Sequence, residues 1–414
     1  DDNRRSARIQ NINYQSGEKV LQHRLGTSYQ LKVSTSSKLE IISFYTDREF
    51  SNKLPFENGG QVNLKRSYWG IGAKYVTDNY LFTHPISTTI GADISDQSDR
   101  RKRYNNIKGD PGSKVFDQLE SFRNNAFYFQ QSYLLKNKIN VIWGSRWDND
   151  KIESLDYYIS DGLGSGFTSL NNTSPFAGLT YLLNKSMSIY ANYSNHYETP
   201  TLNELSNDPD SLSVGGFNSK LNPQISNSFE IGSKGYVNDY FYYDIALFRS
   251  KIDNEITSFE QEESPGKTFY RNIGESQKQG IEMSLSSSIG NNITLNLGYT
   301  YSKFEYANYV KNNKNLNGNR LPGIPQKTFN SDIYYINPNG YFIMAGLTQY
   351  GIIYLNDLND HEIDPYSILN LRVGNEYKLF GSKLKVHIGV NNLLNANYYS
   401  NLRVNAWGGR FYEP

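Results

Sequence analysis

The 414-residue sequence contains no cysteine, which excludes disulfide scaffolds, cysteine-ligated zinc, iron–sulfur clusters and thiol nucleophiles. Its five histidines are scattered, so we expect neither a histidine-rich metal site nor a bound cofactor. Positive and negative charges nearly balance, because the sequence has 42 Lys and Arg and 41 Asp and Glu residues. Nucleic-acid binding needs a basic face, so nucleic acid is not an expected partner. The longest clean apolar stretch, 341–347, is far shorter than the roughly 18 to 20 residues of a membrane helix.

Aromatic residues are abundant instead, with 34 Tyr and 21 Phe in a chain whose mean hydropathy is −0.65. This combination of polarity and aromatic content is typical of membrane β-barrels. Apolar and polar residues alternate along nearly the whole chain, and this period of two predicts β-strands. No segment of similar length has a convincing helical period, so little helix is expected. The clearest alternating segments are 187–193, 241–247, 281–289, 293–301 and 384–390.

Short and long connections between these segments alternate strictly. Short turns rich in Asn, Gly, Ser, Pro and Lys are expected at 34–37, 77–80, 136–138, 184–185, 235–239, 289–292, 337–340 and 380–383. Long polar loops are expected at about 47–60, 95–122, 149–172, 195–223, 252–275, 303–326, 353–365 and 392–410. Eight short turns give 16 strands between residues 19 and 391. A transmembrane barrel has short periplasmic turns and longer outer loops, whereas a propeller repeats its loop lengths every four strands.

We therefore predict an all-β fold, a transmembrane antiparallel β-barrel of about 16 strands with an apolar face toward lipid and a polar face toward the lumen. The residues expected to face lipid include Leu295, Leu297, Tyr299, Leu384, Val386 and Ile388. Those expected to face the lumen include Glu282, Asn296, Lys385 and His387. Candidates for the aromatic girdles at the membrane interfaces are Trp143, Trp147, Tyr157 and Tyr158.

Five groups of short motifs follow one another in the second half of the chain. The first, HYETPTLNEL at 196–205, follows a strand and opens a long loop. The others are LNPQ at 221–224 with FEIG at 229–232, NRLPGIP at 319–325, VNNLLN at 390–395 with YY at 398–399, and GGRFYEP at 408–414. Taken in this order, they resemble the C-terminal barrel of TonB-dependent outer-membrane receptors, in the branch that imports iron complexes. Each motif also has a structural interpretation, which we favour.

The resemblance implies a barrel of about 22 strands with a plug inside it, in the outer membrane of a Gram-negative bacterium. It also implies an N-terminal box that the TonB–ExbB–ExbD complex grips. The sequence departs from this pattern, since nothing before residue 19 reads as a plug and no strand follows Phe411. We therefore expect a fragment, with residues 1–18 as an outer-loop remnant and residues 19–414 as a partial barrel that lacks its last strand. Unpaired strand edges would make such a chain insoluble by itself.

No catalytic arrangement is evident, so the chain is not expected to be an enzyme. The Gly164-Ser165-Gly166 segment lacks the strand–turn–helix setting of a nucleophile elbow. Asp148 and Asp150 precede a long loop, where solvated carboxylates are a simpler interpretation than an acid–base pair. Oxygen-rich loops can hold calcium, but the candidates here have no defined spacing. They are Asp357, Asp360, Glu362 and Asp364.

The long outer loops are the expected place of ligand binding. Segment 95–122 carries the densest basic run, from Arg100 to Arg103, and Tyr104 follows it. Arginine holds carboxylate or catecholate oxygens through two parallel N–H groups, and tyrosine can stack or donate. The predicted ligand contacts are Arg100, Arg101, Arg103, Tyr104, His196 and Tyr197. Lipopolysaccharide phosphates or water are alternative partners of the basic run, and His84 is also expected on the loop side.

These features predict a receptor and transporter for a ferric siderophore or another metal chelate, energised by TonB through a plug outside this chain. Its other expected partners are outer-membrane lipid and lipopolysaccharide. A passive porin is an alternative, although the motifs do not match one, and a barrel enzyme would lack a site. A receptor for cobalamin, haem or a copper complex would need similar loops, so the sequence does not name the ligand.

Overall fold

The computed structural model describes residues 9–210, 216–262, 267–311, 313–399 and 401–406. Helix in these ranges is confined to α1 (Ile9–Asn13), the 3₁₀ helix η1 (Ile159–Asp161) and α2 (Leu202–Leu205). The predicted scarcity of helix is therefore confirmed. Within the same ranges, no helix combines the length and the apolar character that a membrane crossing requires.

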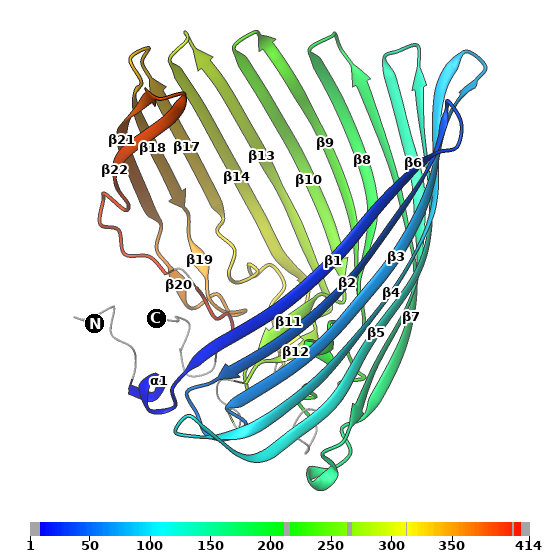
Figure 1. Ribbon diagram of the computed structural model, residues 1–414, viewed down its shortest axis with the longest axis vertical. Helices are drawn as coiled ribbons and strands as arrows, with labels where there is room; N and C mark the ends of the chain where they lie inside the picture. Colours follow the sequence, from blue (N-terminus) through cyan, green and yellow to red (C-terminus); the bar gives the residue numbers. More distant parts are fainter. Residues whose placement is uncertain (1–8, 211–215, 263–266, 312, 400, 407–414) are drawn as a thin grey trace.

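One antiparallel sheet of 16 strands dominates the fold, as the sequence predicted, and its strands follow one another in chain order. Figure 1 shows the sheet curving like the wall of a barrel, with β1 and β22 as its edges. Its strands are β1 (Gly17–Lys32), β2 (Ser37–Lys53), β3 (Gln61–Leu81), β4 (His84–Ile107), β5 (Asp110–Leu135), β6 (Ile139–Asp156), β7 (Gly166–Leu182), β8 (Met187–Glu198), β9 (Gln224–Asn238), β10 (Phe241–Asp253), β13 (Glu275–Ile289), β14 (Ile293–Asn308), β17 (Lys327–Ile336), β18 (Tyr341–Tyr350), β21 (Tyr366–Leu379) and β22 (Ser382–Val390).

The short turns lie along one rim of the sheet, the upper rim in Figure 1. Seven of the eight predicted turns are confirmed to within a few residues. The turn predicted at 77–80 is wrong, because β3 continues to Leu81 and the chain reverses at Phe82 and Thr83 instead. Thr77 pairs with Thr88 across the hairpin. Polar residues near the end of a hairpin do not interrupt the ladder, and so composition alone placed this turn too early.

The long connections lie at the opposite rim, and three of them contain small two-stranded sheets. These sheets pair β11 (Ile256–Phe259) with β12 (Phe269–Asn272), β15 (Val310–Lys311) with β16 (Lys314–Asn315), and β19 (Ile353–Tyr354) with β20 (Glu362–Ile363). The loop predicted at 95–122 is wrong. This segment is a regular hairpin in which β4 and β5 run for 24 and 26 residues, leaving only Lys108 and Gly109 outside the strands.

The two faces of the sheet differ in polarity. Ala191, Ile231 and Leu247 lie side by side on β8, β9 and β10, on the outer, apolar face. Their chain neighbours Asn192 and Glu230 pair on the opposite, inner face. This difference agrees with the predicted alternation of lipid-facing and lumen-facing residues.

The predicted lipid-facing residues of β22 are strongly exposed, and those of β14 are half-buried, so none of them lies in a packed core. Lys385 and His387, predicted to face the lumen, are exposed as well. Every residue of β22 is exposed because it is an edge strand, so exposure does not separate its two faces.

Apolar cores form where the long connections pack, at the loop end of the sheet. One core joins Ile152 of β6 to Leu205, Phe217 and Leu221 of the connection between β8 and β9. A second surrounds Tyr306, Tyr309 and Leu316, and a third contains Ile353, Leu355, Ile363 and Ala406. Helix α2 starts with a capping box, in which Thr201 and Glu204 each satisfy the other's backbone N–H. The long connections are therefore folded structures that cover the inner face at this end.

Candidate ligand-binding site at the loop end

The basic run 100–103 lies on β4, well beyond the short turn, and not on a flexible loop. Side chains alternate between faces along a strand. The odd-numbered members of the run therefore share the inner face with Asp99, and the even-numbered members share the outer face with Ile94, which is 45% exposed. Tyr104 follows at a shift in the register of β4 against β5. The structure thus divides the predicted cluster between two surfaces.

Two buried carboxylates on the inner face each hold an arginine. Asp99 accepts hydrogen bonds from Nε and Nη2 of Arg66 at 2.8 and 2.6 Å. Glu120 accepts from Nε and Nη2 of Arg101, and the Arg101 guanidinium lies 4.7 Å from the centre of the Phe116 ring. Asp99 and Glu120 are 1% and 2% exposed, so these pairs are charge-assisted contacts in a largely dehydrated setting.

Arg103 and Lys267 add two positive charges beside these pairs. Arg103 donates to the Gly59 carbonyl at 3.1 Å, and the Lys267 ammonium lies 4.9 Å from the centre of the Phe269 ring. Among the described residues, no carboxylate forms an ion pair with either cation. Burial and the nearby Arg101 lower the pKa of Arg103 to about 10. The pKa of Lys267 is lowered by burial first and then by Arg103 and Arg101.

We call Arg101, Arg103 and Lys267 the inner cationic site. The described residues around it supply four cations, counting Arg66, against the two carboxylates of Asp99 and Glu120. Partly buried cations without counter-charges are unfavourable until an anion joins them. The site is therefore suited to bind a negatively charged ligand, with the buried rings of Phe116 and Phe269 beside it.

The outer-face members of the basic run have a different setting. Arg100 forms an ion pair with Asp117 at 2.7 Å, and its guanidinium lies 4.1 Å from the centre of the Tyr157 ring. Lys114 also contacts Asp117, at 2.9 Å. Arg100 is thus neutralised within the hairpin, and Tyr157, predicted as a membrane-girdle residue, packs on this cation beyond the end of β6.

The other predicted site residues lie elsewhere on the sheet. His196 is exposed near the end of β8 and shares a hydrogen bond of 2.9 Å with Ser194. The Tyr197 hydroxyl is buried without a hydrogen-bond partner, and burial followed by Asp150 and Asp148 raises its pKa. No hydrogen bond in the described parts of the chain joins either residue to the arginines of β4.

Two other predictions about these side chains are wrong. His84 begins β4 beside the short turn, where its Nδ1 accepts from the Lys136 N–H at 3.3 Å, so it is at the end opposite to the loops. Asp150 is not a solvated loop residue. It lies within β6, is 3% exposed, and accepts from Asn124 at 2.7 Å. The long extension of β6 beyond the expected strand length accounts for this second difference.

The sequence reasoning also missed a polar cluster centred on Asp357, which is fully buried. Its carboxylate accepts hydrogen bonds from the hydroxyls of Tyr306 and Tyr309 at 2.7 and 3.2 Å, and from Asn405 Nδ2 at 2.7 Å. Lys311 Nζ lies at 3.1 Å. Arg271 of β12 lies at 3.6 Å. We call these residues the Asp357 cluster.

The Asp357 cluster explains the acidic run that the sequence offered for calcium. Its carboxylate is already saturated by phenol, amide and cationic donors, so it is not available to coordinate an ion. Asp360 is exposed and accepts instead from Asn356 at 2.6 Å. Within the described residues, no group of three or more His, Asp or Glu side chains is arranged to hold a metal. Of the acidic run, Asp357 therefore links separate connections to one another.

Comparison with known proteins agrees with this architecture. The family model described as TonB dependent receptor-like, beta-barrel, matches residues 1–393. The chain is 26% identical over 313 residues to a probable TonB-dependent siderophore receptor, PiuA, of Acinetobacter baumannii, covering 69% of this chain and 41% of PiuA. It is 25% identical over 279 residues to the ferrioxamine B receptor of Salmonella typhimurium, covering 66% and 36%.

The fold is similar to the crystal structure of the unliganded ferric citrate transporter FecA, with a TM-score of 0.79 at 17% identity. That similarity covers 94% of this chain and 59% of FecA, so the chain spans only part of the length of its relatives. Members of the family are transport receptors and not enzymes, in agreement with the prediction. Since the family model covers nearly the whole sequence, the chain belongs to the TonB-dependent receptor family and contains barrel sequence of that family.

Proposed function

We propose that this chain forms the ligand-catching part of an outer-membrane receptor that imports an anionic ferric chelate with energy from the TonB–ExbB–ExbD complex. The inner cationic site is the observation that carries the proposal, because Arg103 and Lys267 have no carboxylate partner among the described residues. The names of the related siderophore and ferrioxamine B receptors support a ferric chelate as the ligand, and its negative charge is inferred from the site alone. Because the chain covers 41% of PiuA, transport and energy coupling are proposed for the whole protein.

The chemistry of binding follows from this arrangement. Carboxylate or catecholate oxygens of a ferric chelate would accept charge-assisted hydrogen bonds from Arg103 and Lys267. The buried rings of Phe116 and Phe269 help to hold Arg101 and Lys267 in place through cation–π contacts. Arg101 would contribute less because Glu120 already holds it. Neutralising partly buried cations favours binding more than neutralising exposed ones, since water competes less at such a site. The iron ion itself is cargo and needs no protein ligand here.

The remaining predicted contacts are proposed in secondary roles. Arg100 has Asp117 as its counter-charge and would add little affinity. Tyr104, His196 and Tyr197 stay predictions. Of these, the Tyr197 hydroxyl has an unused hydrogen-bonding capacity that a bound chelate could satisfy. Its contribution would be one neutral hydrogen bond, about 0.5 to 1.5 kcal/mol.

The alternation of the basic run supplies a matched test. In the full-length protein, Arg103→Gln with Lys267→Gln removes two inner charges, and Arg100→Gln with Lys102→Gln removes two charges from the outer face of the same strand. Binding of ferric citrate, a ferric catecholate and ferrioxamine B would be measured at low and high salt, with uptake of labelled iron alongside.

We expect the inner pair of substitutions to weaken binding of at least one anionic chelate about tenfold or more, because each lost charge-assisted hydrogen bond is worth roughly 1.5 to 3 kcal/mol. The outer pair should change it less than about twofold, and salt should weaken binding only where the inner charges remain. Equal effects of the two double variants would remove the inner cationic site from ligand binding and leave a general surface effect as the explanation.

A further inference from the structure

Glu120, on the inner face of β5, holds one of the three cations of the inner cationic site. Arg101 donates to it through Nε, at 3.1 Å, and through Nη2. Both contacts end on the same oxygen, Oε1. The protein thus places its own carboxylate on the two Arg101 donors that an anionic ligand would otherwise use.

The neighbouring pair of Arg66 and Asp99 shows a stronger form of the same contact. Nε and Nη2 of Arg66 each donate to a separate carboxylate oxygen, at 2.8 and 2.6 Å. Gln97 adds a third hydrogen bond to Asp99, at 3.2 Å. Two parallel bonds to two oxygens are the strong form of an arginine–carboxylate pair. The contact between Arg101 and Glu120 lacks the second oxygen, so a ligand can replace it more easily.

The surroundings of Glu120 make its negative charge unfavourable. Its side chain is 2% exposed, and Asp99 lies directly opposite on β4, where a like charge destabilises a cross-strand pair. The cations near it are Arg101 of β4 and Arg66 of β3, whereas β6 places the uncharged Ser154 opposite. Burial raises the pKa of the Glu120 carboxyl above its ordinary value, although Arg101 acts in the other direction.

The other charged groups at this end of the sheet do not compensate Glu120. Arg103 and Lys267 lie beside Arg101 and lower each other's hold on a proton, as expected of neighbouring cations. Helix α2 also packs on β5, but the carboxylate of Glu204 is used in its own capping box. Arg101 is therefore the cation that Glu120 and an incoming anion would share.

The pair lies outside the apolar band of the membrane. Glu120 is 15 residues from Leu135, where β5 ends at the short turn. At roughly 3.3 Å per residue and a tilt of about 40°, this places it about 38 Å above that turn, beyond a band about 25 Å tall. The external medium can therefore exchange protons and anions with the pair.

We infer that Glu120 is a built-in competitor for Arg101, which an anionic chelate must displace before it can use all three cations of the inner cationic site. The inference rests on the proposed function, because it concerns the same site and ligand class. Binding should then strengthen whenever Glu120 loses its charge, through substitution or through protonation. Acidification thereby acts on the receptor itself, since a raised pKa lets Glu120 take up a proton at a higher pH than an ordinary glutamate.

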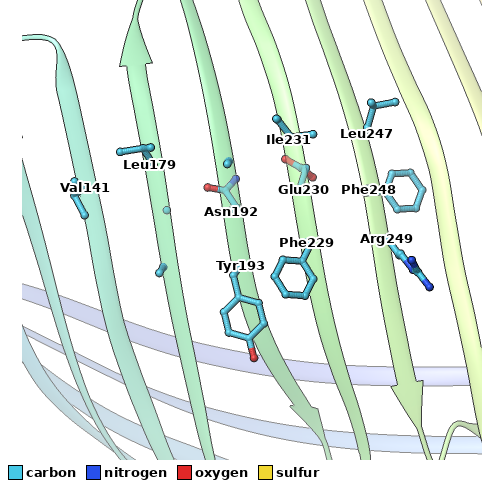
Figure 2. A pocket seen from close by; sticks show the side chains of 13 residues that line it. Val141, Leu179, Asn192, Tyr193, Phe229, Glu230, Ile231, Leu247, Phe248 and Arg249 are labelled. Atoms are coloured by element: carbon cyan, nitrogen blue, oxygen red, sulfur yellow. The ribbon is translucent and has the colours of Figure 1, made fainter.

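A second inner-face carboxylate supplies a control for long-range charge. Figure 2 shows Glu230 of β9 between Asn192 and Phe248, its partners on the two neighbouring strands. Strand β9 is four strands beyond β5. This separation is roughly 19 Å across the sheet, about twice the screening length at physiological salt. The charge of Glu230 should therefore have little influence on the inner cationic site.

The test replaces carboxylates by amides in the full-length protein. Glu120→Gln removes the competitor, and Arg101→Gln with Glu120→Gln removes the competitor together with the cation that it holds. The controls are Glu230→Gln and Asp117→Asn. Asp117 is 3% exposed and holds Arg100 on the outer face of the same hairpin, so it matches Glu120 in burial and in type of partner.

Binding of ferric citrate and of a ferric catecholate would be measured by titration calorimetry from about pH 5 to about pH 8, at low and high salt. Each variant is compared with the unchanged protein at the same pH, so that protonation of the chelate itself cancels. Circular dichroism would show whether each variant is folded.

Near neutral pH, we expect Glu120→Gln to bind at least one of the two chelates about tenfold more tightly than the unchanged protein, which corresponds to about 1.4 kcal/mol. Its binding should also depend more steeply on salt, because one more cation is free. The double variant and both controls should stay within about twofold of the unchanged protein. The advantage of Glu120→Gln should shrink on acidification, as the unchanged protein protonates Glu120.

Unchanged or weaker binding by Glu120→Gln would overturn the inference, since Glu120 would then only position Arg101. An equal gain in the double variant or in Glu230→Gln would overturn it as well, because the gain would not come from a freed Arg101. If Glu120→Gln does not fold, the unchanged protein is compared with the double variant. Acidification must then strengthen binding to the unchanged protein more, and an equal pH dependence overturns the inference.

Failure of the proposed function would be recognised separately. If Arg103→Gln with Lys267→Gln leaves chelate binding unchanged, the proposed function fails and this inference fails with it. If that pair of substitutions weakens binding while Glu120→Gln does not strengthen it, only the competition by Glu120 is refuted.

Discussion

The Asp357 cluster allows a quantitative prediction about the loops. In Asp357→Asn, the remaining carbonyl oxygen still accepts from Tyr306 and Asn405. The new amide, however, presents N–H groups to two cations, which can only donate, and the Tyr309 hydroxyl loses its acceptor unless it turns to accept. Removing one partner of a fully buried ion pair destabilises the folded state by about 3 to 5 kcal/mol. Because Arg271 and Lys311 are 31% and 26% exposed, water compensates in part, and we expect about 2 to 4 kcal/mol.

Hydrogen exchange of the loop amides is the direct assay, because loss of the Asp357 carboxylate should let the loops open while the sheet stays folded. The Leu316 N–H donates to Tyr309 at 2.9 Å and the Asn405 N–H donates to Leu355 at 3.0 Å. Both should exchange roughly 30- to 700-fold faster in the variant, the range that about 2 to 4 kcal/mol implies. Amides in the middle of β4 should be unchanged.

Asp360→Asn is the matched control, since it removes a carboxylate from the same loop at a side chain that is 53% exposed. Substitutions at exposed positions usually change the free energy of unfolding by no more than about 0.5 kcal/mol, so the exchange rates of these amides should change by no more than about twofold. If both variants exchange alike, the buried carboxylate does not hold the loops together and the reasoning fails.

Three further predictions concern pH, the outer face and α2. Burial lowers the pKa of Arg103 to about 10, so the unfolded chain holds this proton more tightly, and the stability difference between the protein and Arg103→Gln should shift in favour of the protein as pH increases past 10. Anion binding needs the charged form and should weaken there, as titration calorimetry would reveal. Ile231→Lys should destabilise the folded barrel wall in lipid bilayers by about 2 to 4 kcal/mol, whereas Asn192→Lys on the inner face should be tolerated. Denaturant unfolding would measure both changes. Thr201→Ala should loosen α2 by about 1 kcal/mol, visible as faster proteolysis of its loop.

The strands were predictable because each carries its own local signal. Segment 293–301 alternates apolar and polar residues, and it lies within β14. The division of the basic run was within reach of the same reasoning, because four consecutive cations cannot share a face once the segment is a strand. It was missed because the polar composition of 95–122 favoured a loop. The lengths of β4 and β5 come from pairing with each other, a contact that composition does not record.

The Asp357 cluster could not be predicted in the same way. Tyr306 and Asp357 are 51 positions apart, and Asn405 is 48 positions beyond Asp357. No motif links them, and each would be read alone as an ordinary loop residue. Lys267 was missed for the same reason, since only the packing of the connection between β11 and β12 brings it near Arg101 and Arg103.

The strand position of the basic run has a consequence for how ligand preference can diverge among related receptors. One residue inserted between Asp99 and Arg100, and taken up at the tip of the hairpin and not in a β-bulge, would shift the pairing of the rest of the run by one residue. Arg100 and Lys102 would then face the lumen, and Arg103 would leave it. A single insertion that retains every arginine would therefore change which positive charges face the lumen at the loop end of the sheet. Length changes in this hairpin are therefore as informative about specificity as substitutions.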